Sequence, residues 1–326
     1  MTPDDVDILV LRSGPHGMPT EDYARELSQR LPDANVFHAA TPEAERAAIK
    51  FARVVTSTRI STALLDQADN LELFAGAAAG YDHLPLDTFR EMGVTVTNAS
   101  GVHGPNIAEQ VLGFVLMFTR RLDEAVRRSQ RGEWRHFQAH ELAGSTVTVV
   151  GLGAIGTAVV ERLQGFDVET VGVRYTPEKG GPTDEVVGFE PAAFNRALAR
   201  TDYLVLACPL TETTRGLVGD AEFDTLPPDA VVVNVGRGSL VDTPALVSAV
   251  QGNRIRGAAL DVTDPEPLPA DHALWDYENV LLTPHNAGHS PKYYERLADI
   301  VAGNVRRLDD GEAVGGLKNV VLDPTE

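Results

Sequence analysis

Short apolar runs alternate with amphipathic stretches along the first hundred residues of the chain. The runs are DILVL, NVFHA, RVVTS, LELFAGAAAG and VTVTNAS, and the segments ARELSQRL and EAERAAI between them carry apolar residues at helical spacing. Strands that alternate with helices are typical of a parallel sheet built from β-α-β units. The pattern therefore predicts an α/β domain.

The same alternation begins again after residue 144. We expect six strands, in STVTVVGLGAIG, ETVGVRY, YLVLACPL, AVVVNVG, IRGAALDV and NVLLTPH. Their almost continuous Val, Leu and Ile content is typical of strands that helices cover on both faces. The pattern predicts a second parallel sheet, of the Rossmann type.

Two longer helical patterns lie outside these runs. One extends from Pro105 to about Gly132 and is long enough to connect two domains. The other, near the C-terminus, places on one face Tyr294, Leu297, Ile300, Val301 and Val305. We expect that face to pack on the first domain. The predicted domains are a discontinuous, flavodoxin-like substrate domain of residues 1–102 and 288–326, and a dinucleotide-binding domain of residues 103–287.

The charge of the chain disfavours several partners. The 326 residues include 47 acids and 28 bases, which give a formal net charge of −19. Such a chain repels phosphate, so nucleic acid and anionic lipid are not expected partners. Lysine occurs only at Lys50, Lys179, Lys292 and Lys318. An acidic, lysine-poor chain favours adaptation to high salt, where screening relieves self-repulsion. An ordinary acidic cytoplasmic enzyme is the alternative.

Other classes are disfavoured by features that the sequence lacks. The single cysteine, Cys208, excludes an internal disulfide and lies in an apolar run. The apolar run VLGFVLMF ends at Arg120 and Arg121, so no membrane span is expected. The acidic start MTPDDVDILV lacks the basic flank of a secretory signal, and we expect a cytoplasmic protein. No metal site is predicted.

A glycine-rich turn joins the first strand of the second sheet to a helical pattern. In VVGLGAIG, the glycines Gly151, Gly153 and Gly156 have the G-x-G-x-x-G spacing. The first can make a tight turn, the second lets the backbone approach a pyrophosphate, and the third allows close helix packing. Because a helix begins here, we expect a dinucleotide to bind, with Ala154 and Ile155 beside its phosphates. A plain tight turn is the alternative.

The end of the next strand bears on the choice between NAD and NADP. An NAD enzyme usually carries an acid there, which binds the ribose 2′-hydroxyl. This chain has Arg174 instead, followed by Tyr175 and Thr176. A cation and a hydroxyl can bind a 2′-phosphate, and no acid repels it. NADPH is therefore the predicted cofactor, with NAD less preferred, unless Arg174 is only a solvated side chain.

Three later strands each end near a residue with suitable chemistry. Arg237 lies in NVGRGSLVD, Glu266 in DVTDPEPL and His285 in LLTPHNAG. In an open α/β sheet, ligands bind at the carboxyl ends of the strands. Reduction of a 2-keto acid needs a cation for the carboxylate, a proton donor for the ketone oxygen and an acid that orients the donor. Together the three residues supply these groups, although each type alone is more often structural.

At this point the chain resembles the D-2-hydroxyacid dehydrogenase family, which includes glyoxylate/hydroxypyruvate reductases and phosphoglycerate dehydrogenases. The matching segments are VVGLGAIG, CPLTETTRGLV, VVVNVGRGSLVD, ALDVTDPEPL and TPHNAG, with weaker matches in AAAGYDHL and NASGVHGPNIAEQ. The resemblance implies that Arg237 binds the substrate carboxylate, that His285 protonates the ketone oxygen and that Glu266 partners the histidine. It also implies that the backbone N–H groups of Ala79 and Gly80 bind the carboxylate.

The resemblance further implies a wall for the cofactor. Asp261 is expected at the nicotinamide carboxamide, with a cap at the end of a strand as the alternative. The other residues expected beside the cofactor are Cys208, Pro209, Thr214, Val235, Gly236 and Gly288. Before Gly80 the family more often has a bulkier residue, so the alanines 77–79 are predicted to leave room for a larger substrate.

The predicted reaction is hydride transfer to the carbonyl carbon of a 2-keto acid in a cleft between the domains, which gives a D-2-hydroxy acid. One alternative is a formate- or phosphite-type dehydrogenase, although the formate branch typically has an amide in place of Glu266. Another is a corepressor-like nicotinamide-binding protein without turnover. The resemblance also implies a homodimer formed through residues 103–128. The apolar face of this helix, with Val111, Phe114, Val115 and Phe118, would equally serve the core of a monomer.

Overall fold

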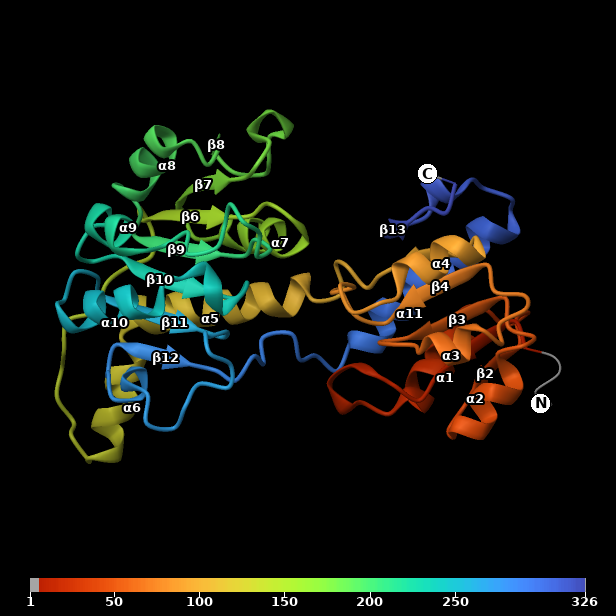
Figure 1. Cartoon of the computed structure of the whole chain (residues 1–326). Coiled ribbons are helices and arrows are strands. Elements are labelled where there is room, and N and C mark those ends of the chain that lie inside the picture. Colours follow the sequence, from red (N-terminus) through yellow and green to blue (C-terminus); the bar gives the residue numbers. More distant parts are fainter. Residues whose placement is uncertain (1–5, 326) are drawn as a thin grey trace. The chain divides into compact units, whose positions relative to one another are not determined.

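The structure, a computed structural model, describes residues 6–325. The chain divides into two compact units (Figure 1). Unit 1 combines the residues up to Val102 with those from His289 onward, and unit 2 spans His103–Gly288. Each unit is an α/β body with its own parallel-rich sheet, which confirms the predicted fold class.

The sheet of unit 1 has six strands in the order β13-β5-β4-β3-β1-β2. The strands are β1 (Ile8–Val10), β2 (Val36–His38), β3 (Val54–Ser57), β4 (Leu73–Gly76), β5 (Thr95–Thr97) and β13 (Val320–Leu322). Strands β1 to β5 are parallel, in the flavodoxin-like order. The prediction of a wholly parallel sheet is corrected by β13, which pairs antiparallel with β5. Three residues are too few to show a period in the sequence.

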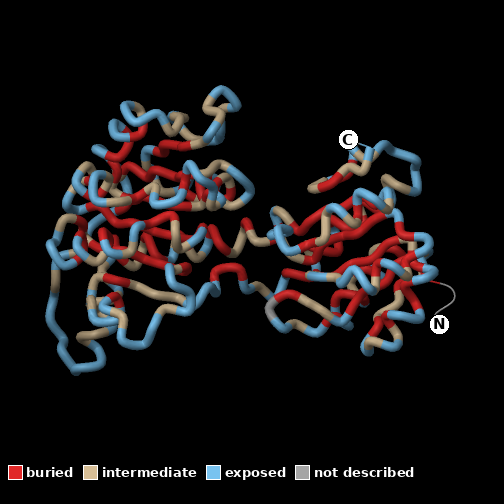
Figure 2. Tube along the Cα trace, in the orientation of Figure 1, coloured by how far each residue is buried: buried red, intermediate tan, exposed pale blue. Residues whose placement is uncertain are grey.

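Alternate residues of the strands in unit 1 enter two different hydrophobic cores. Ile8 and Val10 of β1 pack in one core, whereas Leu9 packs in the other. Because both faces are covered, the strands read as unbroken apolar runs, and they appear as buried segments in Figure 2. The helices are α1 (Thr20–Arg30), α2 (Pro42–Ala48), α3 (Thr62–Leu65), α4 (Leu86–Met92) and α11 (Tyr293–Asp309), with 3-10 turns η1 (Pro15–Gly17) and η5 (Val314–Gly316). The predicted apolar face of α11 packs in the same core as Ile8.

The sheet of unit 2 has seven parallel strands in the order β12-β11-β10-β9-β6-β7-β8. They are β6 (Thr146–Val150), β7 (Glu169–Val173), β8 (Glu185–Val187), β9 (Tyr203–Leu206), β10 (Val231–Asn234), β11 (Gly257–Leu260) and β12 (Val280–Leu282). The sequence pattern predicts six of them and misses β8. This strand is a short edge strand with no fully buried residue, so it has no strong apolar signal.

The helices of unit 2 include one correction. They are α5 (Gly104–Arg120), α6 (Leu122–Gln130), α7 (Ala154–Leu163), α8 (Pro191–Leu198), α9 (Asp220–Thr225) and α10 (Thr243–Gln251), with 3-10 turns η2 (Pro177–Lys179), η3 (Gly238–Leu240) and η4 (Ala273–Trp275). The long pattern that begins at Pro105 is therefore two helices. Arg121 separates them with a left-handed φ of 50°. No glycine or proline marks this break in the sequence, which explains why the pattern reads as continuous.

The apolar face of α5 belongs to the core of unit 2. Val111, Phe114, Val115 and Phe118 pack there with residues of β6, β9 and β10. Of the two roles left open for this face, the core of a single chain is the one that the structure shows. The homodimer stays a prediction.

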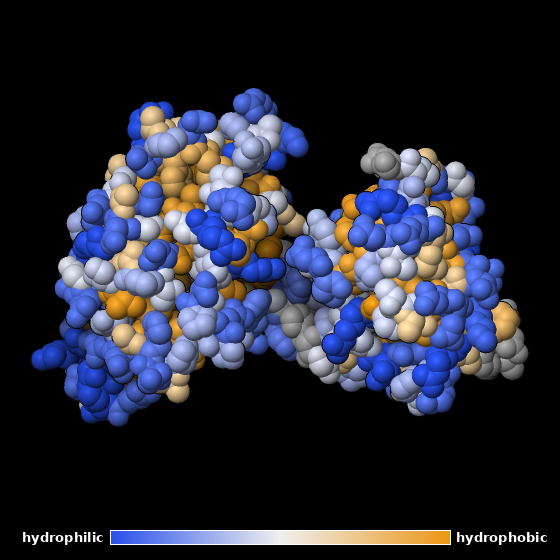
Figure 3. All heavy atoms as spheres, in the orientation of Figure 1, coloured by the Kyte–Doolittle hydropathy of each residue, from blue (hydrophilic) through white to orange (hydrophobic). Residues whose placement is uncertain are grey.

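Two observations apply to the described residues, 6–325. No helix among them is long and apolar enough to cross a membrane. They contain no cluster of three or more His, Cys, Asp or Glu side chains that could hold a metal ion. Hydrophilic residues cover much of the face of each unit seen in Figure 3, as the acidic composition suggests.

Candidate active site

The glycine-rich turn lies between β6 and α7 of unit 2. Gly151 has a left-handed φ of 96°, and a Cβ there would stand 2.7 Å from the Cα of Cys208. A Cβ on Gly156 would stand 1.9 Å from the carbonyl oxygen of Gly151, so only glycine permits this approach of helix and strand. Gly153, directly before α7, faces open space. The turn thus leaves room for a ligand at the N-terminus of a helix that can bind a pyrophosphate.

Arg174 follows β7, at the neighbouring strand end. Its Nη1 donates a hydrogen bond to the carbonyl oxygen of Gly180 at 2.6 Å, which fixes the side chain against the loop. No carboxylate of the described residues forms an ion pair with it. Tyr175 is 80% exposed. The guanidinium group therefore keeps N–H donors and its charge for an anion.

The other residues expected beside the cofactor form a packed base at the ends of the strands. Cys208, Val235 and Gly236 are buried. Burial raises the pKa of the Cys208 thiol to about 11. The hydroxyl of Thr214 donates to the carbonyl oxygen of Pro209 at 2.7 Å, so it stabilises its own turn. Contact of these residues with a cofactor stays a prediction.

Glu266 and His285 form a close pair. Oε1 of Glu266 lies 2.6 Å from Nδ1 of His285, and the two side chains are 42% and 50% exposed. His285 follows β12 with a left-handed φ of 51°, and its backbone N–H donates to the carbonyl oxygen of Asp261 at 2.8 Å. Because Nδ1 is hydrogen-bonded to the Glu266 carboxylate, Nε2 is the ring nitrogen that can contact a substrate.

Asp261 holds the loop that carries the histidine. The carboxylate is buried at the end of β11. It accepts hydrogen bonds from Thr283 Oγ1 at 2.5 Å, from the N–H of Asn286 at 2.8 Å and from the N–H of Ala287 at 3.0 Å. The structure therefore gives Asp261 the capping role that the sequence left as an alternative. Contact with a nicotinamide stays a prediction.

Arg237 follows β10, which lies beside β11. It is exposed, and none of the described carboxylates lies within ion-pair distance of its guanidinium group. Its backbone is braced by Asn234, whose Nδ2 donates to the Arg237 carbonyl oxygen at 2.9 Å. A Cβ on Gly238 would stand 2.0 Å from the carbonyl oxygen of Thr263, so this loop packs directly on the loop that carries Glu266.

The three predicted catalytic residues thus follow three neighbouring strands, β10, β11 and β12. His285 and Glu266 also line a cavity of about 390 Å³, whose other walls are mainly apolar. These walls include Leu268, Trp275 and Leu282. Sequence reasoning missed the supporting residue Asn234, whose only signal is a polar residue at the end of an otherwise apolar strand.

The loop after β4 in unit 1 presents a run of backbone N–H groups. Three successive carbonyl oxygens accept hydrogen bonds, from Tyr293 Oη to Ala77 (2.8 Å), from the Ala99 N–H to Ala78 (3.1 Å) and from Asn98 Nδ2 to Ala79 (2.7 Å). Within residues 6–325, the N–H groups of Ala78, Ala79 and Gly80 have no acceptor. Such a run can bind an anion through the main chain alone. Sequence reasoning found Ala79 and Gly80 by resemblance but missed the two side chains that hold them.

The fold and the strand-end residues together define a dinucleotide-binding α/β protein with a candidate acid-base site. Residues 112–287 match the family model of the D-isomer specific 2-hydroxyacid dehydrogenase, NAD binding domain. The chain belongs to this family. It is therefore an oxidoreductase that uses a nicotinamide cofactor.

Three similar proteins illustrate the relationship. A glyoxylate reductase of Thermofilum pendens is 33% identical over 80% of this chain and 78% of its own length. A D-3-phosphoglycerate dehydrogenase of Methanocaldococcus jannaschii is 31% identical over 94% of this chain, which spans only 59% of that relative. A D-isomer specific 2-hydroxyacid dehydrogenase of Xanthobacter autotrophicus, solved in complex with NADPH and MES, is 27% identical with a TM-score of 0.79, and the match covers 98% of this chain and 99% of that one.

Proposed function

We propose that this protein reduces 2-keto acids to D-2-hydroxy acids, with NADPH preferred over NADH. The observation that carries the proposal is the His285–Glu266 pair at 2.6 Å, beside the loop of the unpaired Arg237. A proton donor with an orienting acid and a cation is the set of groups that this reduction needs. The D configuration rests on family membership.

Each of the three side chains has a separate task in the proposed mechanism. Arg237 binds the substrate carboxylate and stabilises the negative charge that develops on the ketone oxygen. His285, as the imidazolium, donates its Nε2 proton to that oxygen. Glu266 holds the ring through Nδ1 and offsets the positive charge of the imidazolium. The bound cofactor supplies the hydride. The N–H groups of Ala79 and Gly80 stay the predicted second contact of the carboxylate.

The preference for NADPH rests on Arg174. The open space at Gly153 fits a pyrophosphate, and Arg174 stands at the end of β7, where an acid would select NAD. The NADPH complex of the Xanthobacter relative supports the same choice. NADH is expected to be the poorer donor, because it leaves the Arg174 charge without a phosphate partner.

The first experiment is turnover followed at the absorbance band of the reduced nicotinamide. Purified protein is offered glyoxylate, pyruvate and larger 2-keto acids with NADPH or NADH. We expect oxidation of NADPH and loss of turnover in His285→Ala with unchanged NADPH affinity. His136→Ala, a change of the same kind at an exposed site, is the control. Turnover retained in His285→Ala contradicts the mechanism. NADPH binding without any turnover favours the corepressor-like alternative. Oxidation of phosphite or formate favours the phosphite- or formate-type dehydrogenase.

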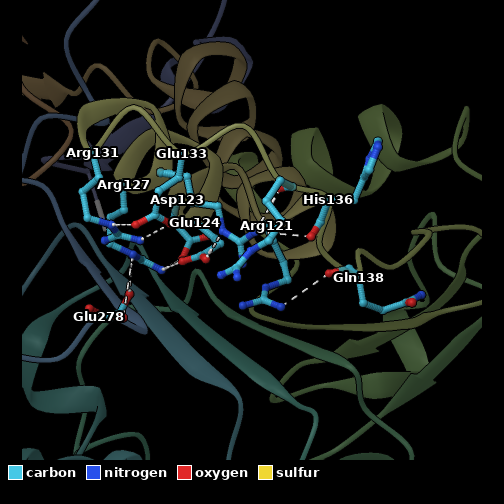
Figure 4. A network of polar contacts seen from close by, with 11 residues as sticks. Arg121, Asp123, Glu124, Arg127, Arg131, Glu133, His136, Gln138 and Glu278 are labelled. Atoms are coloured by element: carbon cyan, nitrogen blue, oxygen red, sulfur yellow. Dashed lines mark hydrogen bonds and ion pairs between the residues drawn. The ribbon is translucent and has the colours of Figure 1, made fainter.

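We also propose a homodimer, supported by a second surface of unit 2. Helix α6 has no buried residue, Leu122 and Val126 are about half exposed, and Trp134 is fully exposed. Ion pairs and hydrogen bonds link α6 to residues 133–138, the segment that contains Trp134 (Figure 4), and they include Arg131–Glu133 at 2.8 Å. A fully exposed tryptophan near half-exposed apolar side chains of α6 is typical of an interface. Sedimentation of the wild type and of Trp134→Glu tests this, with a dimer and a monomer expected. A wild-type monomer contradicts it.

A further inference from the structure

A second cavity, with charged and hydroxyl side chains in its walls, lies in unit 1 at the carboxyl ends of β1 and β3. The strand order β4-β3-β1-β2 means that the chain leaves β1 toward β2 on one side, whereas β3 lies on the other side. In open α/β sheets this reversal of direction opens a crevice in which ligands bind, and flavodoxin-like sheets have it between these two strands. The cavity has a volume of about 400 Å³.

The charges of the cavity come from two arginines and one glutamate. The buried carboxylate of Glu45 accepts from the backbone N–H of Arg12 at 3.1 Å and from its Nε at 3.3 Å. This pair is neutral overall. Arg59 has no carboxylate of the described residues within ion-pair distance, and its Nε donates to Ser13 Oγ at 3.1 Å. The Arg59 guanidinium group is therefore held in place through Nε, and its Nη groups and its charge are left for a ligand.

Hydroxyl groups hold the two loops of the cavity together. Ser13 Oγ lies 2.8 Å from Thr58 Oγ1, and Ser57 Oγ donates to the Ser13 carbonyl oxygen at 3.1 Å. Ser61, the residue before α3, also lines the cavity, and its side chain makes no capping hydrogen bond. A positioned guanidinium with the uncommitted Ser61 hydroxyl nearby suits an oxyanion, because its Nη N–H groups and this O–H can donate to anionic oxygens.

The cavity is connected to the loop that presents the run of N–H groups. His83, three residues after Gly80, has Nε2 2.7 Å from the carbonyl oxygen of Thr58. Because a carbonyl oxygen only accepts, Nε2 is the donor. The loops after β3 and β4 therefore lie side by side at the carboxyl ends of these neighbouring strands. A ligand bound to the N–H groups of Ala79 and Gly80 would have Arg59 on the adjoining loop.

We propose that this cavity binds a second oxyanion of the substrate, so that the preferred 2-keto acids carry a carboxylate or a phosphate monoester at the end away from the keto acid. The inference rests on the proposed function and deepens it. Arg59 recognises the second anion, and the pair Arg12–Glu45 supports the loop after β1. The small side chains of residues 77–79 fit a substrate larger than glyoxylate.

The test compares substrates and variants in two measurements. Steady-state kinetics with NADPH use pyruvate, 2-oxoglutarate and 3-phosphohydroxypyruvate, and calorimetry measures binding of inorganic phosphate. The variant is Arg59→Gln, which removes the charge from an exposed side chain. Arg46→Gln is the matched control, because Arg46 is an exposed arginine on α2 outside the cavity. A lost charge-assisted hydrogen bond predicts KM for the doubly anionic substrates raised about 10- to 100-fold in Arg59→Gln only, with KM for pyruvate changed less than about 2-fold.

The outcomes separate the two proposals. A selective KM effect with either doubly anionic substrate supports the cavity, and the substrate affected shows whether a carboxylate or a phosphate is recognised. Normal reduction of pyruvate, with Arg59→Gln equal to Arg46→Gln for every substrate, overturns the cavity and leaves the proposed function intact. If no keto acid is reduced, the proposed function fails. Phosphate binding that Arg59→Gln abolishes then still supports an oxyanion site, and phosphate binding that is absent or unchanged overturns it.

Discussion

Glu266 Oε1 lies 2.6 Å from His285 Nδ1, although the two residues follow different strands. The carboxylate thereby selects which ring nitrogen can face a substrate. The same contact makes the pair sensitive to the charge of residue 266, because an imidazolium that donates to a neutral amide loses its partner charge.

Glu266→Gln is therefore expected to lower kcat about 10- to 100-fold while the affinity for NADPH stays the same. The amide keeps the shape of the side chain but not its charge. Stopped-flow kinetics and cofactor titration measure the two quantities. Glu278→Gln is the control, because Glu278 is an exposed carboxylate of the same unit. An unchanged kcat in Glu266→Gln would show that the carboxylate does not assist the histidine.

Asp261→Asn should affect both stability and turnover. In asparagine an NH2 group takes the place of Oδ2, which accepts from the buried Ala287 N–H at 3.0 Å, so that N–H keeps only its longer bond to Oδ1, at 3.2 Å, and the expected cost is about 1–3 kcal/mol. Thermal unfolding and kcat are measured together. Asp202→Asn removes a similar acceptor from the Thr146 N–H, remote from His285 in sequence and in another strand pair, and should lower stability alone. Equal kcat losses in both variants would contradict a specific role.

Arg174→Asp is expected to reverse the cofactor preference. The new carboxylate repels the 2′-phosphate of NADPH and can bind the ribose hydroxyls of NADH. The ratio of kcat/KM for the two cofactors should fall about 100-fold or more, equivalent to the loss of roughly two charge-assisted contacts. Arg196→Asp makes the same charge change on the exposed surface of α8. A ratio that moves equally in both variants would mean that Arg174 does not read the phosphate.

Alkaline pH should destabilise the protein partly through Cys208. Its folded pKa is raised to about 11 from 9.0 by burial, so the folded state holds this proton more tightly than the unfolded state. Its contribution to stability is therefore complete below pH 9 and lost as pH rises through about 11, with a total of roughly 2–3 kcal/mol. Denaturant unfolding of the wild type and of Cys208→Ala from pH 8 to 11 measures it. If the free energy of unfolding falls equally with pH in the two proteins, Cys208 does not contribute to the alkaline destabilisation.

Salt should stabilise the chain. At a formal net charge of −19, the acidic side chains repel one another across the surface. The range of this repulsion falls from about 10 Å at 0.1 M to about 3 Å at 1 M salt. We expect the melting temperature to rise with KCl, and to rise less in the triple variant of the exposed, unpaired acids Asp69→Asn, Asp229→Asn and Asp271→Asn. A melting temperature that falls with salt would contradict adaptation to high salt.

The sequence predicts the sheets well because both faces of each are covered. Val147 and Val149 enter one core of unit 2 while Val150 enters the other, so the strand is apolar throughout and easily recognised. The break at Arg121 and the strands β8 and β13 are not visible in the sequence. Backbone conformation at a non-glycine residue and pairing at a sheet edge depend on tertiary contacts that apolar periodicity does not encode.

The candidate site shows the same limit. Arg237, Glu266 and His285 are recognisable because motifs surround them, and strand order then predicts that they follow neighbouring strands. Tyr293 and Asn98 are not recognisable, because each acts through a carbonyl oxygen that is distant in sequence. Arg59 likewise has no motif, and only the reversal of strand direction gives it a cavity.

The three fixed carbonyl oxygens of residues 77–79 have an evolutionary consequence. They hold the loop whose N–H groups, at Ala79 and Gly80, anchor the substrate carboxylate under the proposed function, and every amino acid except proline has such an N–H group. Point mutations in this loop can therefore alter the size of the space above it without erasing the anchor. A lineage could in this way acquire new substrates through gradual changes in unit 1, while the proton donor and its partner in unit 2 are inherited unaltered.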